Sequence, residues 1–344
     1  MISLVTGATG FVGSHVARLL VSRGDTVRVL VRSSSRLEAL DGVPCERVTG
    51  DLRDPESLQK ALKGVQRVFH VAADYRLWSR DPSEIYSSNV EGTRNLLSVA
   101  RDARVEKFIY TSTVATIAVP VAEGVLPDES TPASLKQMIG HYKRSKFIAE
   151  NEALAFARHG LPVIVVNPTT PVGPGDWKPT PTGRIIVDFL NGKMPAFVDT
   201  GLNLVAVEDA AEGHLLAAER GKPGERYLLG GENLTLQQIL AALAKIAGRR
   251  APRLRIPHGL ALAAAYVDAA VSLLLRREPR IPVEGVKIAR HRMFVNTSRA
   301  ERELGFRPTA VAAALERAVQ WYRAHGYVRG TRPTQSAAHA MRAA

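Results

Sequence analysis

Residues 2–20 read ISLVTGATGFVGSHVARLL, and this stretch decides how the fold begins. A short run rich in β-branched residues precedes three glycines spaced three residues apart, Gly7, Gly10 and Gly13. From Phe11 onward, apolar residues recur at helical spacing. Glycine is costly to order inside a regular element. Three glycines between a strand and a helix therefore predict a backbone that bends sharply and is closely approached by another group.

A turn of this kind is suited to the phosphates of a dinucleotide. Gly7 permits the tight turn, Gly10 lets a phosphate approach the N–H groups of the helix N-terminus, and Gly13 lets the helix pack closely on the strand. A second strand is expected at residues 25–32. In this context GxxGxxG predicts dinucleotide binding, and a glycine-rich turn without a ligand is the alternative.

The end of the second strand distinguishes NAD from NADP. NAD sites usually place Asp or Glu there for the adenosine ribose hydroxyls, whereas NADP sites offer Arg to the 2′-phosphate. Arg32 stands at this position, and the next charged residues are Arg36 and Glu38. The sequence therefore favours NADP, with NAD as the alternative if Arg32 stacks on the adenine.

Composition limits the protein class and its partners. The 344 residues, 45% of them hydrophobic, suit one large α/β unit or two coupled domains. The single cysteine, Cys45, excludes an intrachain disulfide and favours a reducing cytoplasm, and we expect no leader peptide before the first strand. The net charge of +13 suits a phosphorylated cofactor or an anionic membrane surface. The basic residues are scattered without a recognisable nucleic-acid module, so we expect no nucleic-acid partner.

Strand and helix patterns alternate along the first half of the chain. Gly160 is a good end for the helix that precedes the sixth strand. That strand is nearly all apolar, as expected when helices cover both faces of a parallel sheet. The expected strands after the first two are residues 45–52, 66–74, 105–113 and 161–169, and the expected helices are residues 55–62, 82–103 and 141–160.

The pattern changes after Asn167, where a long loop rich in Pro, Gly and Thr is expected. The segments expected beyond it are a helix at 184–191, a strand at 203–207, a helix from 208, a strand at 225–231 that returns to the sheet, helices from 235 and at 258–275, and two short helices ending near 327. This order predicts an α/β fold, a Rossmann-type doubly wound parallel sheet with a smaller, mostly helical C-terminal substrate domain.

The expected domain boundaries follow from this order. The cofactor domain comprises residues 1–170 plus about 203–232. The substrate domain comprises about 171–202 and 233–327, and residues 328–344 form a loose tail.

An Ala/Leu-rich stretch, HGLALAAAYVDAAVSLLLRR at residues 258–277, approaches the length that spans a membrane. Asp268 interrupts it, and alanine is only mildly apolar. We predict a buried helix of the second domain. The alternative is an interfacial helix tipped with Arg276 and Arg277, which would allow peripheral membrane contact.

Three residues suit proton transfer at a reacting oxygen. Tyr142 and Lys146 lie four apart on the helix at 141–160, so they share one face. A nearby ammonium lowers the pKa of a phenol, so Lys146 is expected to make Tyr142 a general acid or base. The fifth strand ends with Thr111, Ser112 and Thr113, which offer hydroxyls to position the reacting oxygen.

These motifs together resemble the extended short-chain dehydrogenase/reductases, also described as the NAD-dependent epimerase/dehydratase family. The resemblance reaches to about residue 325, and it rests on TGATGFVG, GDLRD, FHVAA, NVEGTRNLL, YTST and YKRSK. Within the group, residues 70–93 and 167–186 are most similar to hopanoid-associated sugar epimerases, themselves similar to dihydroflavonol 4-reductases and 3β-hydroxysteroid dehydrogenases. The resemblance implies Thr113, Tyr142 and Lys146 as the catalytic set and a homodimer formed through the two long helices.

The resemblance, with the glycine turn and Arg32, also implies a set of cofactor-binding residues. Lys146 is expected to hold the nicotinamide ribose as well as to act on Tyr142. The expected cofactor-binding residues are Gly7, Thr9, Gly10, Phe11, Val12, Gly13, Arg32, Asp51, Leu52, Val71, Ala72, Ala73, Asn89, Tyr142, Lys146 and Pro168.

The substrate residues are less well defined by sequence. Tyr75 and Trp78 follow the nicotinamide-side strand and are candidates for a pocket wall, with packing under a loop as the alternative for Trp78. Asn167 matches an Asn that contacts the nucleotide sugar in related epimerases, but the Arg usually found shortly before it is missing, and a structural amide is an equal alternative. We assign His141 and Arg184 to the surface and expect no metal.

Two enzymatic functions fit these residues. One is an NAD(P)-dependent epimerase or oxidoreductase acting on a sugar-like or hopanoid-linked substrate; the other is an NADPH-dependent ketone reductase of the dihydroflavonol-reductase type. A non-catalytic NADP sensor is a remote alternative, because such proteins often lose the Tyr or Lys that this chain keeps.

Overall fold

The computed structural model describes residues 1–117, 124–275 and 277–329. The chain divides into two compact units. The first comprises residues 1–169, 208–230 and 295–307, and the second comprises residues 170–207, 231–294 and, within the described residues, 308–329. The expected tail lies outside the described residues from position 330, as does Arg276.

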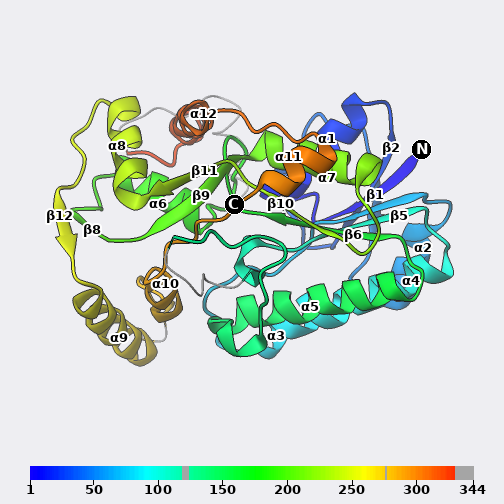
Figure 1. Cartoon of the computed structure of the whole chain (residues 1–344), viewed down its shortest axis with the longest axis horizontal. Helices are drawn as coiled ribbons and strands as arrows, with labels where there is room; N and C mark the ends of the chain where they lie inside the picture. Colours follow the sequence, from blue (N-terminus) through cyan, green and yellow to red (C-terminus); the bar gives the residue numbers. More distant parts are fainter. Residues whose placement is uncertain (118–123, 276, 330–344) are drawn as a thin grey trace. The chain divides into compact units, whose positions relative to one another are not determined.

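The first unit is built on a parallel sheet that has seven strands in the described part of the chain, in the order β10-β6-β5-β4-β1-β2-β3 (Figure 1). Every pairing in it is parallel. The strands are β1 (Ile2–Thr6), β2 (Thr26–Val31), β3 (Glu46–Thr49), β4 (Arg67–His70), β5 (Lys107–Thr111), β6 (Val163–Pro168) and β10 (Arg226–Leu229). The predicted doubly wound sheet is confirmed, including the return of residues 226–229 beside β6.

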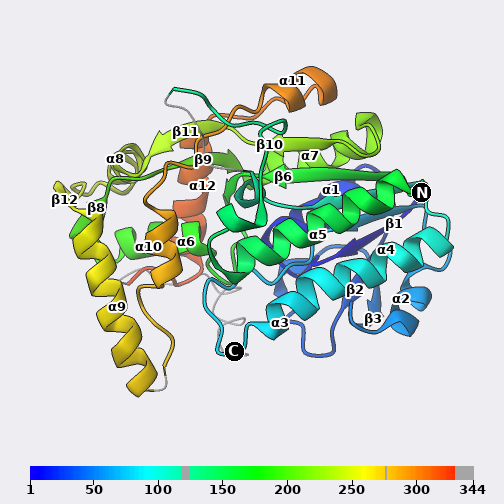
Figure 2. The same ribbon diagram turned by 60° about the horizontal axis from the view of Figure 1, so that its bottom comes forward.

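Helices cover both faces of this sheet (Figures 1 and 2). Apolar side chains such as Leu4, Val68 and Phe108 are fully buried against the helices of one face. On that face lie α2 (Pro55–Leu62), α4 (Gly92–Asp102) and α5 (Gly140–Arg158); on the other lie α1 (Phe11–Ser22), α7 (Val207–Arg220) and α11 (Ser298–Leu304). Short helical turns occur at η1 (Glu38–Leu40), η3 (Val114–Thr116) and η4 (Leu135–Gln137).

Local sequence explains where α2 begins, and the structure shows that a second expected helix is interrupted. Pro55 occupies the first turn of α2, and the Asp54 carboxylate accepts from the Glu56 N–H at 3.1 Å. The helix expected at 82–103 is interrupted: α3 (Ser83–Tyr86) passes into a π-helical turn, η2 (Ser87–Glu91), before α4. Such turns often occur at functional sites.

The second unit contains two small sheets in its described residues, β11-β9-β7 and β12-β8. Its core joins side chains of α6, α8 and α12 with those of the first of these sheets. Its elements are β7 (Thr170–Val172), α6 (Pro181–Leu190), β8 (Ala196–Val198), β9 (Gly201–Ala206), β11 (Glu232–Thr235), α8 (Leu236–Ala247), β12 (Leu254–Ile256), α9 (His258–Leu274), α10 (Val283–Ile288) and α12 (Val311–Ala324).

The observed units differ from the expected division in two segments. Strand β9 belongs to the second unit because it pairs with β7 and β11, and β7 lies inside the segment expected to be loop. Residues 295–307 belong to the first unit, where Leu304 and Phe306 are buried and the Arg220 guanidinium donates to the Leu304 carbonyl at 2.8 Å. Contacts between segments that are distant in the sequence therefore determine to which unit β9 and residues 295–307 belong.

The prediction that residues 258–275 form a buried helix is wrong in its burial. The helix exists as α9, but Ala265 and Ser272 are the only buried residues along it, and all of α9 is described. An apolar composition indicates burial only when another element covers the helix.

Candidate active site

The first unit brings four predicted segments to one edge of its sheet. Strands β1, β4, β5 and β6 run parallel, so the residues that follow them lie at the same carboxyl edge. This edge carries Gly7, Ala72, Thr113 and the end of β6 at Asn167 and Pro168. Ligands of open α/β sheets bind at this edge.

The glycine turn has the geometry of a phosphate cradle. Gly7 has φ +72°, and a Cβ there would lie 2.6 Å from the Cα of Ala72. A Cβ on Gly13 would lie 2.2 Å from the Gly7 carbonyl oxygen. Gly10 is the N-cap of α1 and offers no side-chain cap, and the first turn holds no acidic residue. The N–H groups of that turn therefore point to an open, partially positive helix end that fits the phosphates of a dinucleotide.

A buried chain of hydrogen bonds begins at Thr6, the residue that precedes the glycine turn. Thr6 Oγ1 lies 2.7 Å from His70 Nδ1, and His70 Nε2 lies 2.9 Å from Thr93 Oγ1. Because the Thr93 hydroxyl donates to the Asn89 carbonyl at 2.6 Å, Nε2 must carry the ring proton. Burial, together with the Lys146 charge, lowers the pKa of His70 to about 3, so the imidazole is neutral. Sequence reasoning did not identify this chain, which ties β1 to β4 and α4.

Lys146 is fully buried in α5 and faces the end of β5. Its Nζ donates to the Tyr110 hydroxyl and to the Thr111 carbonyl, both at 2.8 Å, and lies 4.4 Å from the centre of the Tyr110 ring. Burial lowers the pKa of Lys146 to about 7, and the Glu150 carboxylate opposes this shift. Burial also raises the pKa of Tyr110 well above its usual value, so Tyr110 remains a neutral phenol.

Tyr142 lies one turn before Lys146, and the Thr113 side chain lies close enough to its phenol to influence its pKa. Burial raises the pKa of Tyr142, and the Thr113 side chain partly opposes the rise. We expected the Lys146 ammonium to lower this pKa. That expectation is contradicted, because desolvation dominates and Lys146 donates to Tyr110 and the backbone instead. Thr113 also caps η3, since its Oγ1 accepts from the Ala115 N–H at 3.2 Å.

A buried carboxylate continues this face of α5, and sequence reasoning did not identify it. Glu150 follows Lys146 by four residues, so the spacing already carried the signal. Glu150 Oε2 accepts from the Thr116 hydroxyl and the Asn167 amide at 2.8 Å each. Glu150 Oε1 forms an ion pair with Arg226 of β10 at 3.0 Å. The carboxylate thus joins α5, η3, β6 and β10 behind the candidate catalytic residues.

Asn167 is fully buried within this network. Its Nδ2 donates to Glu150 Oε2 and, at 3.1 Å each, to the Thr113 carbonyl and Thr116 Oγ1. The amide nitrogen is therefore engaged by the protein, as the structural alternative expects. Its Oδ1 and the neighbouring Ser112 Oγ are buried without a hydrogen-bond partner.

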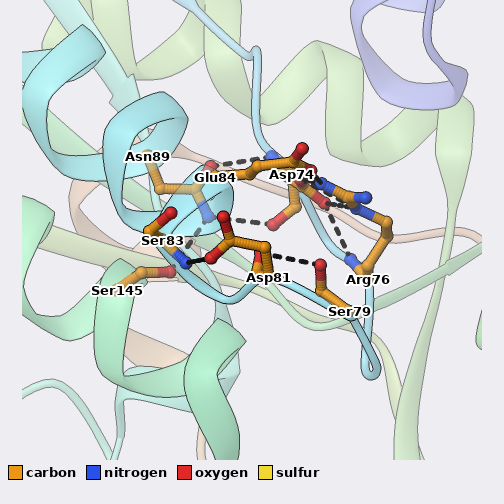
Figure 3. Close-up of polar contacts among 8 residues, drawn as sticks. All are labelled: Asp74, Arg76, Ser79, Asp81, Ser83, Glu84, Asn89 and Ser145. Carbon is orange, nitrogen blue, oxygen red and sulfur yellow. Dashed lines mark hydrogen bonds and ion pairs between the residues drawn. The ribbon is translucent and has the colours of Figure 1, made fainter.

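Asn89 lies in the π-helical turn and links the segment after β4 to α5 (Figure 3). Its Oδ1 accepts from the Asp74 N–H at 2.7 Å. Its Nδ2 donates to the Asp74 carbonyl at 2.9 Å and to Ser145 Oγ at 3.0 Å. The Ser145 hydroxyl in turn donates to the Tyr142 carbonyl at 2.9 Å. Asn89 was expected to bind the cofactor; its amide hydrogens are instead engaged by protein atoms.

Arg76 organises the same segment. Its guanidinium pairs with Asp74 at 2.5 Å and with Glu84 of α3 at 2.8 Å, and Figure 3 shows the acidic side chains beside Arg76. Tyr75 and Trp78 lie on either side of Arg76 in the chain, and both side chains are exposed. Their exposure leaves them available as walls of a substrate site.

The expected adenine-side residues lie after β2 and β3. Arg32 is exposed, and its backbone N–H donates to Ser35 Oγ at 3.0 Å. Asp51 forms an ion pair with Arg53 at 2.7 Å, and this contact, aided by the Arg32 charge, lowers the pKa of Asp51 to about 2. Leu52 is half-buried; a Cβ on Gly92 would lie 2.8 Å from its Cβ.

The remaining predicted residues are placed as follows. Thr9, Phe11, Val12, Val71 and Ala73 are half-buried, and Pro168 is buried. The Tyr86 hydroxyl lies 3.3 Å from His141 Nδ1. Arg184 is exposed on α6. In the part of the chain that the structure describes, no group of three or more His, Cys, Asp or Glu could hold a metal ion.

Comparison with known proteins identifies the class to which this fold and site belong. Residues 3–230 match the model of the NAD dependent epimerase/dehydratase family. A putative dihydroflavonol 4-reductase of Synechocystis sp. is 48% identical over 94% of this chain and 95% of its own length. Sterol demethylase protein B of Methylococcus capsulatus is 38% identical over 95% of this chain and 100% of its own length. The crystal structure of a nucleoside-diphosphate-sugar epimerase from Pseudomonas aeruginosa matches with a TM-score of 0.79 at 29% identity, covering 96% of this chain and 99% of that one.

The chain therefore belongs to the NAD dependent epimerase/dehydratase family, whose members are extended short-chain dehydrogenase/reductases. It is an enzyme of that superfamily, with reductases and epimerases among its relatives. The predicted family and the predicted enzymatic character are confirmed.

Proposed function

We propose that this enzyme reduces the carbonyl of an apolar, ring-containing substrate with NADPH, or oxidises the corresponding alcohol. The observation that carries the proposal is the placement of the Thr113 side chain, which follows β5, close enough to the Tyr142 phenol to oppose the rise in its pKa, one helical turn from Lys146. A phenol beside a second hydroxyl defines a position where one substrate oxygen can contact both.

The roles of these residues follow from their contacts. When bound, the nicotinamide cofactor supplies or accepts the hydride. The Tyr142 pKa lies above its usual value, so the phenol enters the reduction protonated and donates its proton to the carbonyl oxygen as negative charge develops there. The Thr113 hydroxyl fixes that oxygen. Lys146 uses two of its ammonium hydrogens on Tyr110 and Thr111, which leaves the third for the nicotinamide ribose.

The buried Asn167 favours a reductase over a nucleotide-sugar epimerase. In the related epimerases the matching Asn contacts the nucleotide sugar, whereas here its amide nitrogen donates to Glu150, Thr113 and Thr116. The exposed aromatic side chains Tyr75 and Trp78 support an apolar ring system as substrate. Two relatives are named for flavonoid and sterol chemistry, which supports the same class. Hopanoid-linked sugars are a second candidate, supported by the resemblance of residues 70–93.

We propose NADP rather than NAD on the charges after β2. Asp51 is already paired with Arg53, which leaves the exposed Arg32 guanidinium for a 2′-phosphate. Because Asn89 is fully engaged by Asp74 and Ser145, we assign it to positioning α5 rather than to direct cofactor binding.

The enzyme is proposed to act as a homodimer in the cytoplasm. Half-buried apolar side chains such as Phe147 and Ile148 lie on α5, which packs beside α4. They line a small surface hollow with Leu135 and Ala155. Sedimentation of the full chain tests the dimer, and a Phe147→Glu variant that remains dimeric would exclude this face.

The first experiment identifies the nucleotide released on denaturing the purified protein and measures NADPH and NADH binding to the emptied protein. We expect weakly held nucleotide and at least tenfold tighter binding of NADPH. In Arg32→Ala the NADPH affinity should fall at least tenfold while NADH affinity, the internal control, changes less than twofold. Stoichiometric, non-exchanging NAD would contradict both the cofactor and the reductase assignment and would indicate an epimerase cycle.

The second experiment measures net turnover with ring-containing ketones, including steroid and flavonoid ketones. Consumption of one NADPH per ketone reduced supports the reductase. Interconversion of sugar epimers with no net change in NADPH absorbance refutes it.

A further inference from the structure

Helix α9 presents a continuous apolar surface to solvent. Seven of its exposed positions recur at intervals of three and four residues, which is one face of an α-helix. All of them are apolar and exposed: Leu260, Ala263, Ala264, Val267, Ala270, Val271 and Leu274, here called the α9 face. Val267 is 65% exposed and Leu274 is 84% exposed, although the outward face of a helix on a globular protein is ordinarily polar. A surface of this kind marks a place where another body docks.

Asp268 is the one Asp, Glu, Lys or Arg within α9, and its contacts lie off this face. Asp268 forms an ion pair with Arg277 at 2.7 Å and accepts from the Ile281 N–H at 2.8 Å. Helix α10 packs along α9, where Lys287 Nζ lies 5.6 Å from the centre of the Tyr266 ring (Figure 2). The contacts that hold α9 in place therefore leave the α9 face bare.

Positive charge is concentrated around this apolar face in the sequence. Residues 249–292 contain ten Lys or Arg residues and three acidic ones, so this short segment carries about half of the net charge of +13. Arg253, Arg255, Arg280 and Arg290 are exposed in it. An apolar helix face flanked by arginines is complementary to a bilayer with anionic headgroups, where the apolar side chains enter the headgroup–acyl boundary.

A membrane fits this surface better than a second copy of the chain. A helix of 17 residues is about 25 Å long and 10 Å wide. A contact of that footprint falls short of the ~800 Å² per partner that a stable protein interface needs. Two copies would also bring two strongly basic segments together. No helix among the described residues is long and apolar enough to cross a membrane, so α9 can lie on a bilayer but not span it.

We propose that the α9 face docks this enzyme peripherally on an anionic lipid bilayer, with the helix lying in the plane of the interface. This proposal is independent of the reaction, because it rests on α9 and its flanking charges alone. Docking of this kind would bring the enzyme to substrates dissolved in the membrane.

The test is flotation of the full chain with lipid vesicles at low and high salt. We expect partition onto vesicles of equal phosphatidylglycerol and phosphatidylcholine, weaker at high salt, and at least tenfold less onto phosphatidylcholine alone. In the double variant Val267→Glu, Leu274→Glu partition onto the anionic vesicles should fall at least tenfold. The matched control is Val125→Glu, Leu126→Glu, which adds the same charge at exposed apolar positions of the first unit and should bind as the parent does.

Three results would overturn the proposal. They are absence of binding to anionic vesicles, equal binding to the two vesicle types, and equal loss in both double variants. Sedimentation of the same proteins identifies the alternative occupant: a dimer that only the Val267→Glu, Leu274→Glu variant converts to monomer would assign the α9 face to a second copy. Because the substituted side chains are exposed, the variants should keep the melting temperature of the parent, and this measurement accompanies each binding experiment.

Discussion

Replacing Gly7 by alanine tests the phosphate cradle most directly. Two physical effects act at this position. The backbone has φ +72°, which costs an L-residue with a side chain about 1–2 kcal/mol. The new Cβ would also lie 2.6 Å from the Cα and the N of Ala72, where ordinary contact begins near 3.4 Å.

The size of the second effect follows from what must move. The obstructing atoms are backbone atoms of Val71 and Ala72, just after β4, so no side chain can swing aside. Overpacking of this kind costs about 1–3 kcal/mol. We therefore expect Gly7→Ala to lower the free energy of unfolding by about 2–5 kcal/mol. The displaced turn should also weaken binding of the proposed cofactor at least tenfold.

Gly24 supplies a matched control for the backbone effect. It follows α1 with φ +84°, and a Cβ there would meet nothing within 4 Å. Gly24→Ala should therefore lose only about 1–2 kcal/mol and keep cofactor affinity within twofold. Urea unfolding of both variants, with cofactor titration by nucleotide fluorescence, gives the comparison. Equal destabilisation by the two substitutions, or unchanged cofactor affinity in Gly7→Ala, would refute the reasoning.

Three further predictions concern α5. Tyr142→Phe should reduce turnover by about 10²–10⁴-fold at unchanged melting temperature; a variant within threefold of the parent would exclude Tyr142 as the proton donor. Glu150→Gln leaves the Arg226 charge without its partner and should lower the free energy of unfolding by about 2–3 kcal/mol, against at most about 1 kcal/mol for Glu152→Gln in an exposed pair; equal losses in urea unfolding would contradict this. The pKa of Lys146 is about 7 in the folded chain and about 10.4 when unfolded, so the unfolded chain binds the extra proton between these values and stability should rise with pH across that window. Lys146→Met should flatten that rise in unfolding free energies measured from pH 7 to 10, and an unchanged slope would show that another group causes it.

Much of the fold could be read from local patterns. The strand–turn–helix of residues 2–22 is specified by β-branched residues, glycines and helical periodicity within a few residues of one another. The same holds for α2, which Pro55 and Asp54 delimit, and for the Tyr142–Lys146 spacing on α5. The Tyr/Lys pair, the strand-end hydroxyl and the glycine turn were therefore visible together as a family signature, which the comparison confirmed.

The functional assignments of individual amides and carboxylates could not be read in this way. Asn89 and Asn167 look alike in sequence to residues that contact ligands, yet their amides are engaged by Asp74 and Glu150 from other elements. Glu150 looked like one more polar residue of a long helix until Arg226 of β10 was placed against it. The packing of distant strands determines which groups these side chains bond to, and the local spacing of residues cannot predict those partners.

The sequence by itself determined the alternation of strands and helices, the glycine turn and the face shared by Tyr142 and Lys146, because each depends on residues within one or two turns of each other. Tertiary structure decided what each surface meets. Desolvation, which depends on every neighbouring element, raised the pKa of Tyr142 where the nearby lysine alone suggested the reverse. The tertiary structure also left α9 uncovered, although the composition of this helix suggested burial. Burial depends on the element that covers a helix as well as on the helix itself.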